Sequence, residues 1–432
     1  MSGPEPDFDV IVVGAGVAGC VTAYELAGRG LSVALIERGE TPGSKNLSGG
    51  VLYCRAMQEV FPDFLTEAPV ERIIDRNRVC FLNPTSWVGL DYGDERLHQA
   101  GTAVTVLRAH LDAWLAGQCE DAGVMVMPGV RVDALLVEDG AVRGVRAEDD
   151  VLRARVVVAA DGVNSFLARD AGLRDRPPQR HLAVGVKALV RLPRETLEER
   201  FGVAGDHGVA MALVGDCTQG IGGGGFLYTN RDSVSVGVVL RLDDLTGKRA
   251  TAADVFDHLL DHPFVAPLLA GGELVEYGSH LVAEGGEEMR GRLVHDGLVI
   301  VGDAAGLTIN SGLTVRGMDL AVGSARAAAD GIAAALAEDD TSAAGLAGYE
   351  RALADSFVGR DLRTYARAPR FLENERLYGA YGTLAADVLH DVFHLDGTPR
   401  RHLLPTARAV LRGSGVGLGR LARDAWQGVR AL

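Results

Sequence analysis

The fold is decided by the stretch Phe8–Gly19, FDVIVVGAGVAG. Its first part, Phe8–Val13, is a short apolar run that predicts a buried β-strand. Gly14, Gly16 and Gly19 follow at once in a G-x-G-x-x-G pattern. The first glycine of such a pattern allows a tight turn, the second lets the backbone approach a pyrophosphate, and the third lets the following helix pack closely on the strand. The stretch therefore predicts a dinucleotide-binding turn.

The residues that follow continue a strand–turn–helix–strand unit. Residues 20–27 have helical spacing, and residues 31–36, LSVALI, form the next predicted strand. The helix N-terminus offers free N–H groups and the positive end of a dipole to a phosphate. Glu37 closes the second strand, where its carboxylate can accept hydrogen bonds from a ribose diol. Glu37 would repel a 2′-phosphate, although Arg38 beside it weakens that argument against NADP.

Two later segments favour FAD over NAD. Residues 156–165, VVVAADGVNS, and residues 299–306, VIVGDAAG, are buried-strand patterns that end in Asp161-Gly and Gly-Asp303. An aspartate at the carboxyl end of a strand can accept a hydrogen bond from the ribityl chain of a flavin. Gly317 begins a long Ala-rich helix whose N–H groups can face the N1–C2=O edge of the flavin and stabilise the charge of its reduced form. Together with the N-terminal unit, these segments predict bound FAD.

The middle of the chain has a different pattern. Between residues 181 and 242 long alternating strands predict an antiparallel sheet on the substrate side of the molecule. The last ninety or so residues are mostly helical in pattern. The strands predicted in the middle region are residues 182–192, 209–214 and 226–240.

Composition excludes several classes of protein. The 432 residues include 58 acidic and 43 basic side chains, and a formal charge of −15 argues against nucleic-acid binding. The sequence has no run of about 18 apolar residues, which argues against a membrane-spanning helix. The short acidic start, residues 1–9, leads straight into a strand and does not resemble a signal peptide. We therefore expect a cytoplasmic protein, with peripheral membrane contact through the arginine-rich tail after residue 400 as an open alternative.

The cysteines and histidines predict no metal. No two of the five cysteines have C-x-x-C spacing, and their number is odd. This argues against a disulfide framework, a zinc site and an iron–sulfur cluster. The pairs His258/His262 and His390/His394 have i, i+4 spacing, but neither has the glutamate of an H-E-x-x-H motif. Solvated or packed histidines are the better interpretation.

Six segments together resemble the FixC-type branch of flavoproteins. This branch is related to electron-transfer-flavoprotein:quinone oxidoreductases, to geranylgeranyl reductases and, more distantly, to the aromatic-hydroxylase class of FAD monooxygenases. The resemblance runs from Asp9 to about Ser324 and is weaker through the C-terminal helices. The segments are GAGVAG, LIERG, GSKNLSGG, VLRAHLDAWLA, ADGVNS and VGDAAGLTINSGLTVRGMDLA.

The resemblance implies a set of FAD-binding residues. It implies pyrophosphate contacts at the glycines of the turn and at Arg108, ribose contacts at Glu37, and a backbone contact of Val132 with the adenine. Hydroxylases of the class place an arginine three residues after the serine of ADGVNS, where this chain has Ala168, and this weakens a nicotinamide-binding role. The full implied set is Gly14, Gly16, Ala18, Gly19, Glu37, Arg38, Lys45, Asn46, Gly50, Arg108, Val132, Asp161, Gly162, Asp303, Gly317 and Met318.

The expected fold class is α/β. It comprises a glutathione-reductase-like Rossmann FAD-binding domain, an inserted antiparallel-sheet substrate domain and a helical C-terminal region. The FAD-binding domain is predicted from residues 1–85, 100–175 and 290–337, the substrate domain from 86–99 and 176–289, and the helical region from 338–432.

The expected activity is that of a FAD-dependent oxidoreductase that transfers electrons or a hydride to or from a small organic or quinone-like substrate. No catalytic residue is assigned, because outer-sphere electron transfer by a flavin needs no general acid or base. Two alternatives stay open, an NAD(P)H-dependent flavin monooxygenase and an electron-relay subunit of a flavoprotein–quinone complex. Candidate electron partners are an electron-transfer flavoprotein, a ferredoxin or NAD(P)H.

The sequence lacks cysteines spaced to bind an iron–sulfur cluster, and this leaves two explanations of how electrons reach or leave the flavin. Either a separate ferredoxin relays electrons, as the FixC-type resemblance implies, or the scaffold is reused for a flavin-only reaction on a metabolite. At this level we favour the second, because the arginine-rich tail alone indicates a membrane.

Overall fold

The glycine-rich turn follows β1 (Phe8–Val13), an inner strand of an eight-stranded sheet. The computed structural model describes residues 5–46 and 50–432. In the sheet β1 lies between β2 and β10 and pairs in parallel with both. On the outer sides, β2 pairs in parallel with β7, and β10 pairs in parallel with β17. Ligands of such doubly wound sheets bind at the carboxyl ends of the strands. The other strands of this sheet are β2 (Val33–Glu37), β7 (Met125–Pro128), β8 (Ala134–Glu138), β9 (Ala141–Ala147), β10 (Asp150–Ala159), β16 (Val294–His295) and β17 (Leu298–Ile300).

Three helices pack against one another beside this sheet, because α1 (Val17–Ala27) contacts both α5 (Arg108–Asp121) and α11 (Met318–Ala337). Among the described residues, α11 alone is long and apolar enough to cross a membrane, and 72% of its apolar window is buried inside the protein. That burial is typical of a core helix. Shorter helices of this half are α2 (Arg55–Val60), α3 (Phe64–Glu67), α6 (Phe166–Asp170), α12 (Ala343–Leu346), α13 (Gly348–Asp355) and α14 (Phe357–Thr364).

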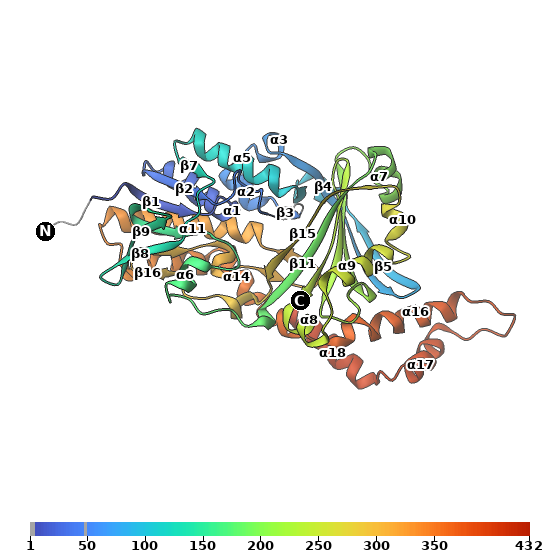
Figure 1. Cartoon of the computed structure of the whole chain (residues 1–432). Coiled ribbons are helices and arrows are strands. Elements are labelled where there is room, and N and C mark those ends of the chain that lie inside the picture. The colour runs from blue at the N-terminus through green and yellow to red at the C-terminus, as the bar shows by residue number, and fades with distance from the viewer. Residues whose placement is uncertain (1–4, 47–49) are drawn as a thin grey trace.

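A nine-stranded sheet forms the second half of the molecule (Figure 1). Its order is β15-β11-β14-β13-β12-β4-β6-β3, and β5 pairs with β4 at the side. All pairs are antiparallel except β4 with β12, which are parallel. The strands are β3 (Val51–Tyr53), β4 (Val70–Asn83), β5 (Ser86–Gly93), β6 (Ala103–Val106), β11 (Leu182–Arg191), β12 (His207–Gly215), β13 (Gly223–Thr229), β14 (Ser233–Arg241) and β15 (Glu273–Ala283).

Two features of this sheet differ from the sequence-based expectation. The predicted single strand 226–240 is the hairpin of β13 and β14, because the chain turns where the Asn230 N–H donates to the Ser233 carbonyl oxygen at 2.8 Å. The predicted domain boundary at residue 85 is displaced, because β4 already belongs to the nine-stranded sheet. β4 pairs with the nearby β5 and β6, but its pairing with β12, more than a hundred positions along the chain, gives no local sign in the sequence.

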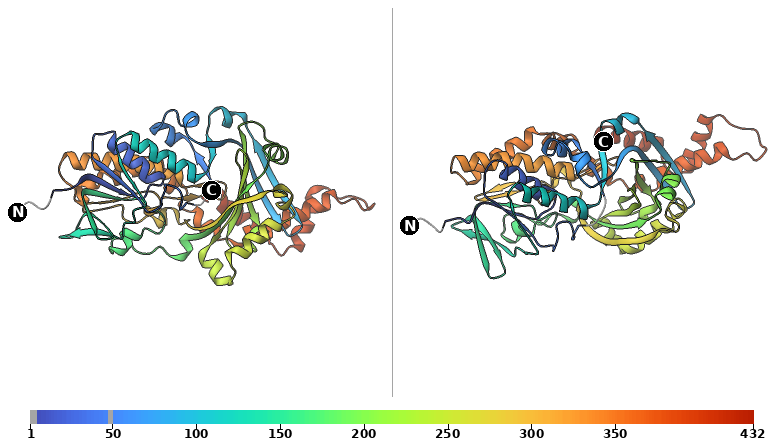
Figure 2. Two further views of the ribbon diagram at one scale, coloured as in Figure 1. Left: turned by 45° about the horizontal axis from the view of Figure 1, so that its top comes forward. Right: turned by 90° about the horizontal axis from the view of Figure 1, so that it is seen from above.

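The C-terminal region extends from the main body as helices (Figures 1 and 2). In both figures α16 and α17 project beyond the nine-stranded sheet, and α18 returns toward the body. The bounds are α15 (Ala368–Leu372), α16 (Ala380–Phe393), α17 (Leu403–Gly413) and α18 (Leu418–Ala431). Helices attached to the sheet half are α4 (Glu95–Gln99), α7 (Arg194–Phe201), α8 (Leu242–Lys248), α9 (Ala252–Asp261) and α10 (Ala266–Leu269). The short pair β18 (Ile309–Asn310) and β19 (Val315–Arg316) precedes α11.

Each half has its own hydrophobic core. The first is centred on fully buried residues such as Ile11, Leu35 and Val158 of the parallel sheet. The second includes Met211 of β12 and Val236 of β14. Burying one such side chain stabilises the folded state by about 1.5–3 kcal/mol. Each core therefore stabilises one side of a site between the two halves.

Candidate FAD and substrate site

A cavity of about 1180 Å³ is lined by residues from both halves of the molecule. Every residue that the sequence assigned to FAD lines this cavity, with the exception of Gly19. The sequence-predicted positions, which are scattered from residue 14 to residue 318, are therefore brought together in one place.

The three glycines of the turn have different neighbours. A Cβ at Gly14 would lie 2.4 Å from the Ala160 carbonyl oxygen, and one at Gly19 would lie 1.8 Å from the Gly14 carbonyl oxygen. Both glycines are thus required by the packing of the turn itself. A Cβ at Gly16 would contact only Arg108 Nη2, at 3.5 Å, so a side chain there would project into the cavity. Gly16 is thus the glycine whose lack of a side chain leaves space in the cavity.

Glu37 is held in place by the backbone around the turn. Its Oε2 accepts a hydrogen bond from the Ala15 N–H at 2.9 Å, and its Oε1 accepts one from the Gly39 N–H at 2.7 Å. Each carboxylate oxygen has a further lone pair for a ribose hydroxyl. Arg38, which is exposed, and Val132 line the cavity together with Glu37.

A guanidinium faces the cavity beside the turn. Arg108 begins α5 and donates from Nε and Nη2 to Asp112, both at 2.8 Å. Asp112, which is fully buried, also accepts a hydrogen bond from Asn46 Nδ2 at 2.5 Å. These bonds fix one rotamer of Arg108 and connect the loop containing Asn46 to α5. Lys45 in the same loop is exposed.

The loop that the sequence singled out as family-specific is described only in part, because Leu47, Ser48 and Gly49 lie outside the described residues. Gly50 follows them and is next to α11, since a Cβ at Gly50 would lie 3.2 Å from Met318 Cε. Gly317 and Met318 line the cavity at the N-terminus of α11.

Two half-buried aspartates lie at the ends of the predicted strands. Asp303 is near the N-terminus of α11, and a Cβ at Gly317 would be 3.8 Å from its Oδ1. Burial raises the pKa of Asp303, while the positive charge of Arg108 acts in the opposite direction. Burial also raises the pKa of Asp161, whose Oδ2 accepts the Leu167 N–H at 3.1 Å. Its Oδ1 is buried and has no hydrogen-bond partner among the described residues.

These features fit FAD. Gly16 opens the turn to a pyrophosphate, Arg108 supplies a fixed positive charge beside it, and Asp303 offers buried acceptor oxygens near a helix N-terminus. The unpartnered Oδ1 of Asp161 is a further acceptor beside the same cavity. Gly162 lines the cavity next to it.

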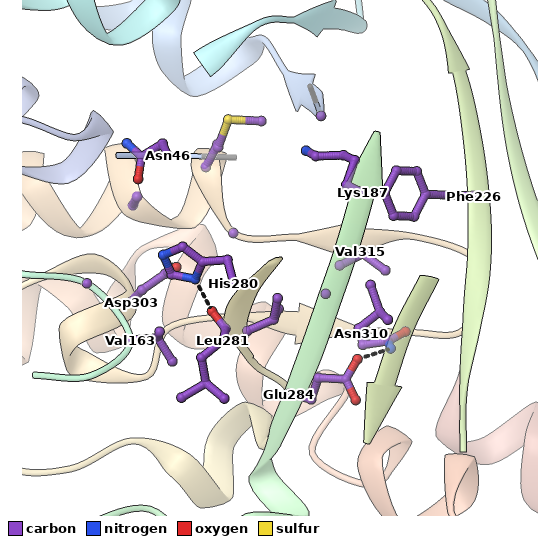
Figure 3. Close-up of a pocket in the computed structure, with 18 of the residues that line it drawn as sticks. Asn46, Val163, Lys187, Phe226, His280, Leu281, Glu284, Asp303, Asn310 and Val315 are labelled. Carbon is purple, nitrogen blue, oxygen red and sulfur yellow. Dashed lines mark hydrogen bonds between the residues drawn. The ribbon is translucent and has the colours of Figure 1, made fainter. Parts of the chain in front are cut away.

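The opposite wall of the cavity was not predicted from the sequence (Figure 3). Lys187 of β11 and Phe226 of β13 lie side by side there, with Lys187 Nζ 5.9 Å from the ring centroid. Burial lowers the pKa of Lys187 to about 7. Lower in the same view, Glu284 follows β15 and its Oε1 accepts a hydrogen bond from Asn310 Nδ2 at 3.4 Å. Burial raises the pKa of Glu284.

These wall residues leave no local signal because Lys187, Phe226 and Glu284 come from separate segments of the chain. Alternation shows which residues share a face of a sheet, but the pairing that gathers them is fixed only in three dimensions. Tyr53 and Tyr228 also line this wall. Burial raises the pKa of each phenol, so both hydroxyls stay protonated near neutral pH.

Comparisons with family profiles agree with the site. The profile described as "FAD dependent oxidoreductase" matches residues 9–60, which contain the glycine-rich turn and Glu37. The profile described as "ETF-QO/FixC family C-terminal domain" matches residues 368–432, which contain α15 to α18.

Two curated relatives match over nearly the whole chain. The chain is 44% identical over 427 residues to "Probable electron transfer flavoprotein-quinone oxidoreductase YdiS" of Escherichia coli strain K12, covering 98% of this chain and 99% of that one. It is 43% identical over 430 residues to "Protein FixC" of the same organism, covering 99% and 100%.

Solved structures share the fold at lower identity. A geranylgeranyl bacteriochlorophyll reductase-like protein of Thermoplasma acidophilum has a TM-score of 0.68 and 19% identity, with 96% and 98% of the two chains covered. The flavin-dependent brominase Bmp2 has a TM-score of 0.64 and 17% identity, with 98% of each chain covered. The expected α/β flavoprotein fold, FAD as cofactor and oxidoreductase activity are confirmed by these comparisons together. The chain belongs to the FixC and electron-transfer-flavoprotein:quinone oxidoreductase family of FAD-dependent oxidoreductases.

Proposed function

We propose that this chain accepts electrons from an electron-transferring flavoprotein and passes them through FAD to a quinone-class substrate. The observation that carries the proposal is the lining of the cavity, which includes both the glycine-rich turn and exposed apolar side chains. The apolar residues there are Leu313, Val315 and Leu432, with 63%, 58% and 39% exposure. A hydrophobic molecule with a redox-active ring suits such an entrance better than a charged metabolite does.

Full-length similarity also favours this substrate class over a metabolite reaction. The relative YdiS carries the name of a flavoprotein–quinone oxidoreductase, and the similarity to it spans both the FAD-binding half and the substrate wall. For this reason we prefer quinone reduction to the metabolite reaction that the sequence alone favoured.

Bound FAD supplies the ability to store two electrons and release them to an acceptor. The chain holds it through the residues that line the cavity around the turn. Gly14, Gly16 and Gly19 shape the cradle, Arg108 faces the pyrophosphate, and Glu37 binds the adenosine ribose. The other residues of the proposed FAD site are Ala18, Arg38, Lys45, Asn46, Gly50, Val132, Asp161, Gly162, Asp303, Gly317 and Met318.

The substrate wall supplies what a quinone needs besides electrons. A quinone takes up two electrons and two protons when it becomes a quinol, so a buried reaction requires a proton donor near it. Glu284 lines the cavity, and burial favours its protonated form. In the proposed reaction the Glu284 carboxyl gives one proton to one quinone oxygen and is reprotonated from solvent, and the other quinone oxygen takes the second proton from solvent.

We propose that the C-terminal helices hold the site at a membrane surface. Exposed apolar side chains occur along α16 to α18 and their connecting loops, together with many arginines. An apolar surface mixed with basic residues is typical of proteins that lie on anionic lipid. The apolar residues are Phe393, Leu395, Leu403, Leu404, Leu418, Trp426 and Val429.

The test is anaerobic reduction of the bound FAD followed by stopped-flow reoxidation. We expect a short-chain ubiquinone or menaquinone analogue to reoxidise the FAD much faster than dissolved oxygen or NAD(P)⁺ does. A matched measurement replaces the quinone by its already reduced quinol, which should leave the flavin reduced. Reoxidation by oxygen that is faster than by any quinone, with incorporation of oxygen into an organic substrate, would contradict the proposal and support a monooxygenase.

A further inference from the structure

Asp75, His98 and His207 come together outside the lining of the large cavity. One ligand atom of each lies within 4.8 Å of the ligand atoms of the other two. Asp75 is in β4, His98 in α4 and His207 at the start of β12. Because these residues are far apart in the sequence and belong to three elements, no spacing motif could reveal them.

A β-bulge directs Asp75 toward the two histidines. In the parallel pair of β4 and β12, Ile74 is opposite Gly208 and Arg76 is opposite Val209, so Asp75 is an extra residue without a partner in the register. Bulges of this kind turn a side chain out of the regular alternation, and they are found near functional sites. The Asp75 carbonyl oxygen also accepts the Asp94 N–H at 3.0 Å, which anchors the start of α4 beside the bulge.

The hydrogen bonding of the three side chains is incomplete. Asp75 Oδ2 is hydrogen-bonded to His207 Nδ1, and His98 Nδ1 lies 3.5 Å from the same oxygen. His98 Nδ1 is buried and has no hydrogen-bond partner among the described residues. The two imidazole rings are stacked, with centroids 3.9 Å apart. The three ligand atoms thus lie close together, and one ring has to tilt out of the stack before both imidazole lone pairs can point at one ion.

A carboxylate on the far side of His98 fixes how that ring can bind. Asp206 Oδ1 lies 3.7 Å from His98 Nε2. A carboxylate beside one ring nitrogen favours the proton there and leaves the lone pair on the other nitrogen, which here is Nδ1. Carboxylates play this part for metal-binding histidines in many proteins.

The charges around the cluster favour a cation. Arg76 is paired with Asp91 at 2.6 Å, and Arg96 is paired with Asp94. These arginines are therefore already matched by carboxylates. Asp75, Asp206 and Glu95 all contribute negative potential at His207.

We infer that Asp75, His98 and His207 form a binding site for one divalent ion of the zinc class. Two imidazole nitrogens and one carboxylate oxygen are a donor set that such ions accept, and water completes the coordination. The ligand atoms are Asp75 Oδ2 and Nδ1 of both histidines, with the proton of His207 moved to Nε2. The ion joins the bulge of β4 to α4 and to the start of β12, so its role is to stabilise this end of the nine-stranded sheet. The sequence predicted no metal here, and this inference replaces that prediction.

The test is zinc titration of the chelator-treated FAD-containing protein by calorimetry, with thermal unfolding measured in parallel. We expect one Zn²⁺ per chain and a higher unfolding temperature with zinc. His98→Gln and His207→Gln should each weaken binding at least about tenfold, and Asp206→Asn should weaken it by about tenfold because it only orients His98. Cobalt should bind in place of zinc and give absorption at wavelengths longer than those of the flavin.

A matched control removes the other histidine pair. His390 in α16 and His394 directly after it are stacked with ring centroids 5.1 Å apart, and the double variant H390Q/H394Q should leave zinc affinity unchanged. Flavin content and circular dichroism establish that each variant is folded. Absence of a stoichiometric zinc site would overturn the inference. So would binding that persists in H98Q/H207Q but is lost in H390Q/H394Q.

Discussion

At the scale of single residues, the three glycines of the turn predict different outcomes of substitution. Gly16 has φ −84° and ψ −175°, an extended conformation that any residue adopts. A valine at Gly16 would therefore leave the protein folded while its side chain blocks the pyrophosphate. We expect Gly16→Val to give a folded, colourless protein, measured as flavin absorbance per chain and by circular dichroism.

Gly19→Val is the contrasting variant, because its side chain would collide with the Gly14 carbonyl oxygen. We expect this variant to be poorly folded as well as colourless. Full flavin occupancy in Gly16→Val would contradict the assignment of the turn to FAD binding.

Asp303 should contribute to FAD affinity through a charged hydrogen-bond acceptor. Removing it in Asp303→Ala should weaken FAD binding by about 1.5–3 kcal/mol, which is roughly tenfold to a hundredfold in Kd. Kd can be measured by titrating the flavin-free protein with FAD and following flavin fluorescence. Asp149→Ala, at an exposed position, is the control and should have an unchanged Kd. If both variants bind FAD equally well, Asp303 is only part of a loop.

Glu284 should act in proton transfer to the acceptor and not in FAD binding. We expect Glu284→Gln to slow reoxidation by quinone about a hundredfold while flavin content stays normal. Because burial raises the pKa of Glu284, the carboxyl keeps its proton to higher pH than an ordinary glutamate. The wild-type rate should therefore be highest at low pH and fall as the pH rises through that raised pKa.

In the Glu284→Gln variant the same pH dependence should be absent. Glu288→Gln is the matched control, because Glu288 also lines the cavity but has a side chain that is 59% exposed. An identical pH profile in wild type and Glu284→Gln would show that the proton comes from elsewhere.

At the scale of elements, the sequence predicted those that form from local patterns. The strands β1 and β10 end in continuous apolar runs, β17 is apolar throughout, and α11 is a long Ala-rich segment, so each can be recognised without knowledge of its partners. The hairpin of β13 and β14 was missed because apolar and polar residues alternate on both sides of the turn. The membership of β4 was missed because its parallel partner, β12, is far along the chain.

The projecting α16–α17 segment should determine binding to lipid. Leu403 and Leu404 are 64% and 60% exposed at the start of α17. Burial of a leucine in an apolar phase is worth about 1.5–3 kcal/mol, so Leu403→Ser with Leu404→Ser should weaken binding to anionic vesicles at least about tenfold. Co-sedimentation with phosphatidylglycerol vesicles measures the effect.

The control for this prediction lies on the opposite half of the molecule. Val137 and Val151 are 48% and 40% exposed on β8 and β10, and replacing both by serine should not change vesicle binding. Neutral phosphatidylcholine vesicles should bind the wild type more weakly than anionic ones. Equal binding by wild type and the Leu403/Leu404 variant would exclude this segment as the membrane contact.

At the scale of the whole molecule, one half of the site could be predicted and the other could not. The FAD side is built from glycines and acids at strand ends, where the chemistry of a phosphate or a ribose restricts the residue type. The wall that contains Lys187, Phe226 and Glu284 lines the same cavity, but its residues come from separate segments with no fixed spacing in the sequence. The same holds for Asp75, His98 and His207, which only the pairing of distant strands brings together.

The last prediction concerns electron transfer through the whole chain, which we expect to proceed without an iron–sulfur cluster. All five cysteines are buried and free, and the last of them is Cys217. Burial raises the pKa of Cys54 and of Cys217 to about 12, which disfavours the thiolate that iron requires.

Cys20 and Cys119 are neighbours, since Cys119 Sγ donates to the Cys20 carbonyl oxygen at 3.2 Å, but Cys54, Cys80 and Cys217 belong to other elements. An electron-transfer route through an iron–sulfur cluster would therefore require a separate ferredoxin. Iron and acid-labile sulfide analysis of protein purified without oxygen checks this, and we expect neither in stoichiometric amount. A stoichiometric cluster would mean that these cysteines can rearrange, and a stable ferredoxin in pull-downs would show that the cluster is supplied by a second protein.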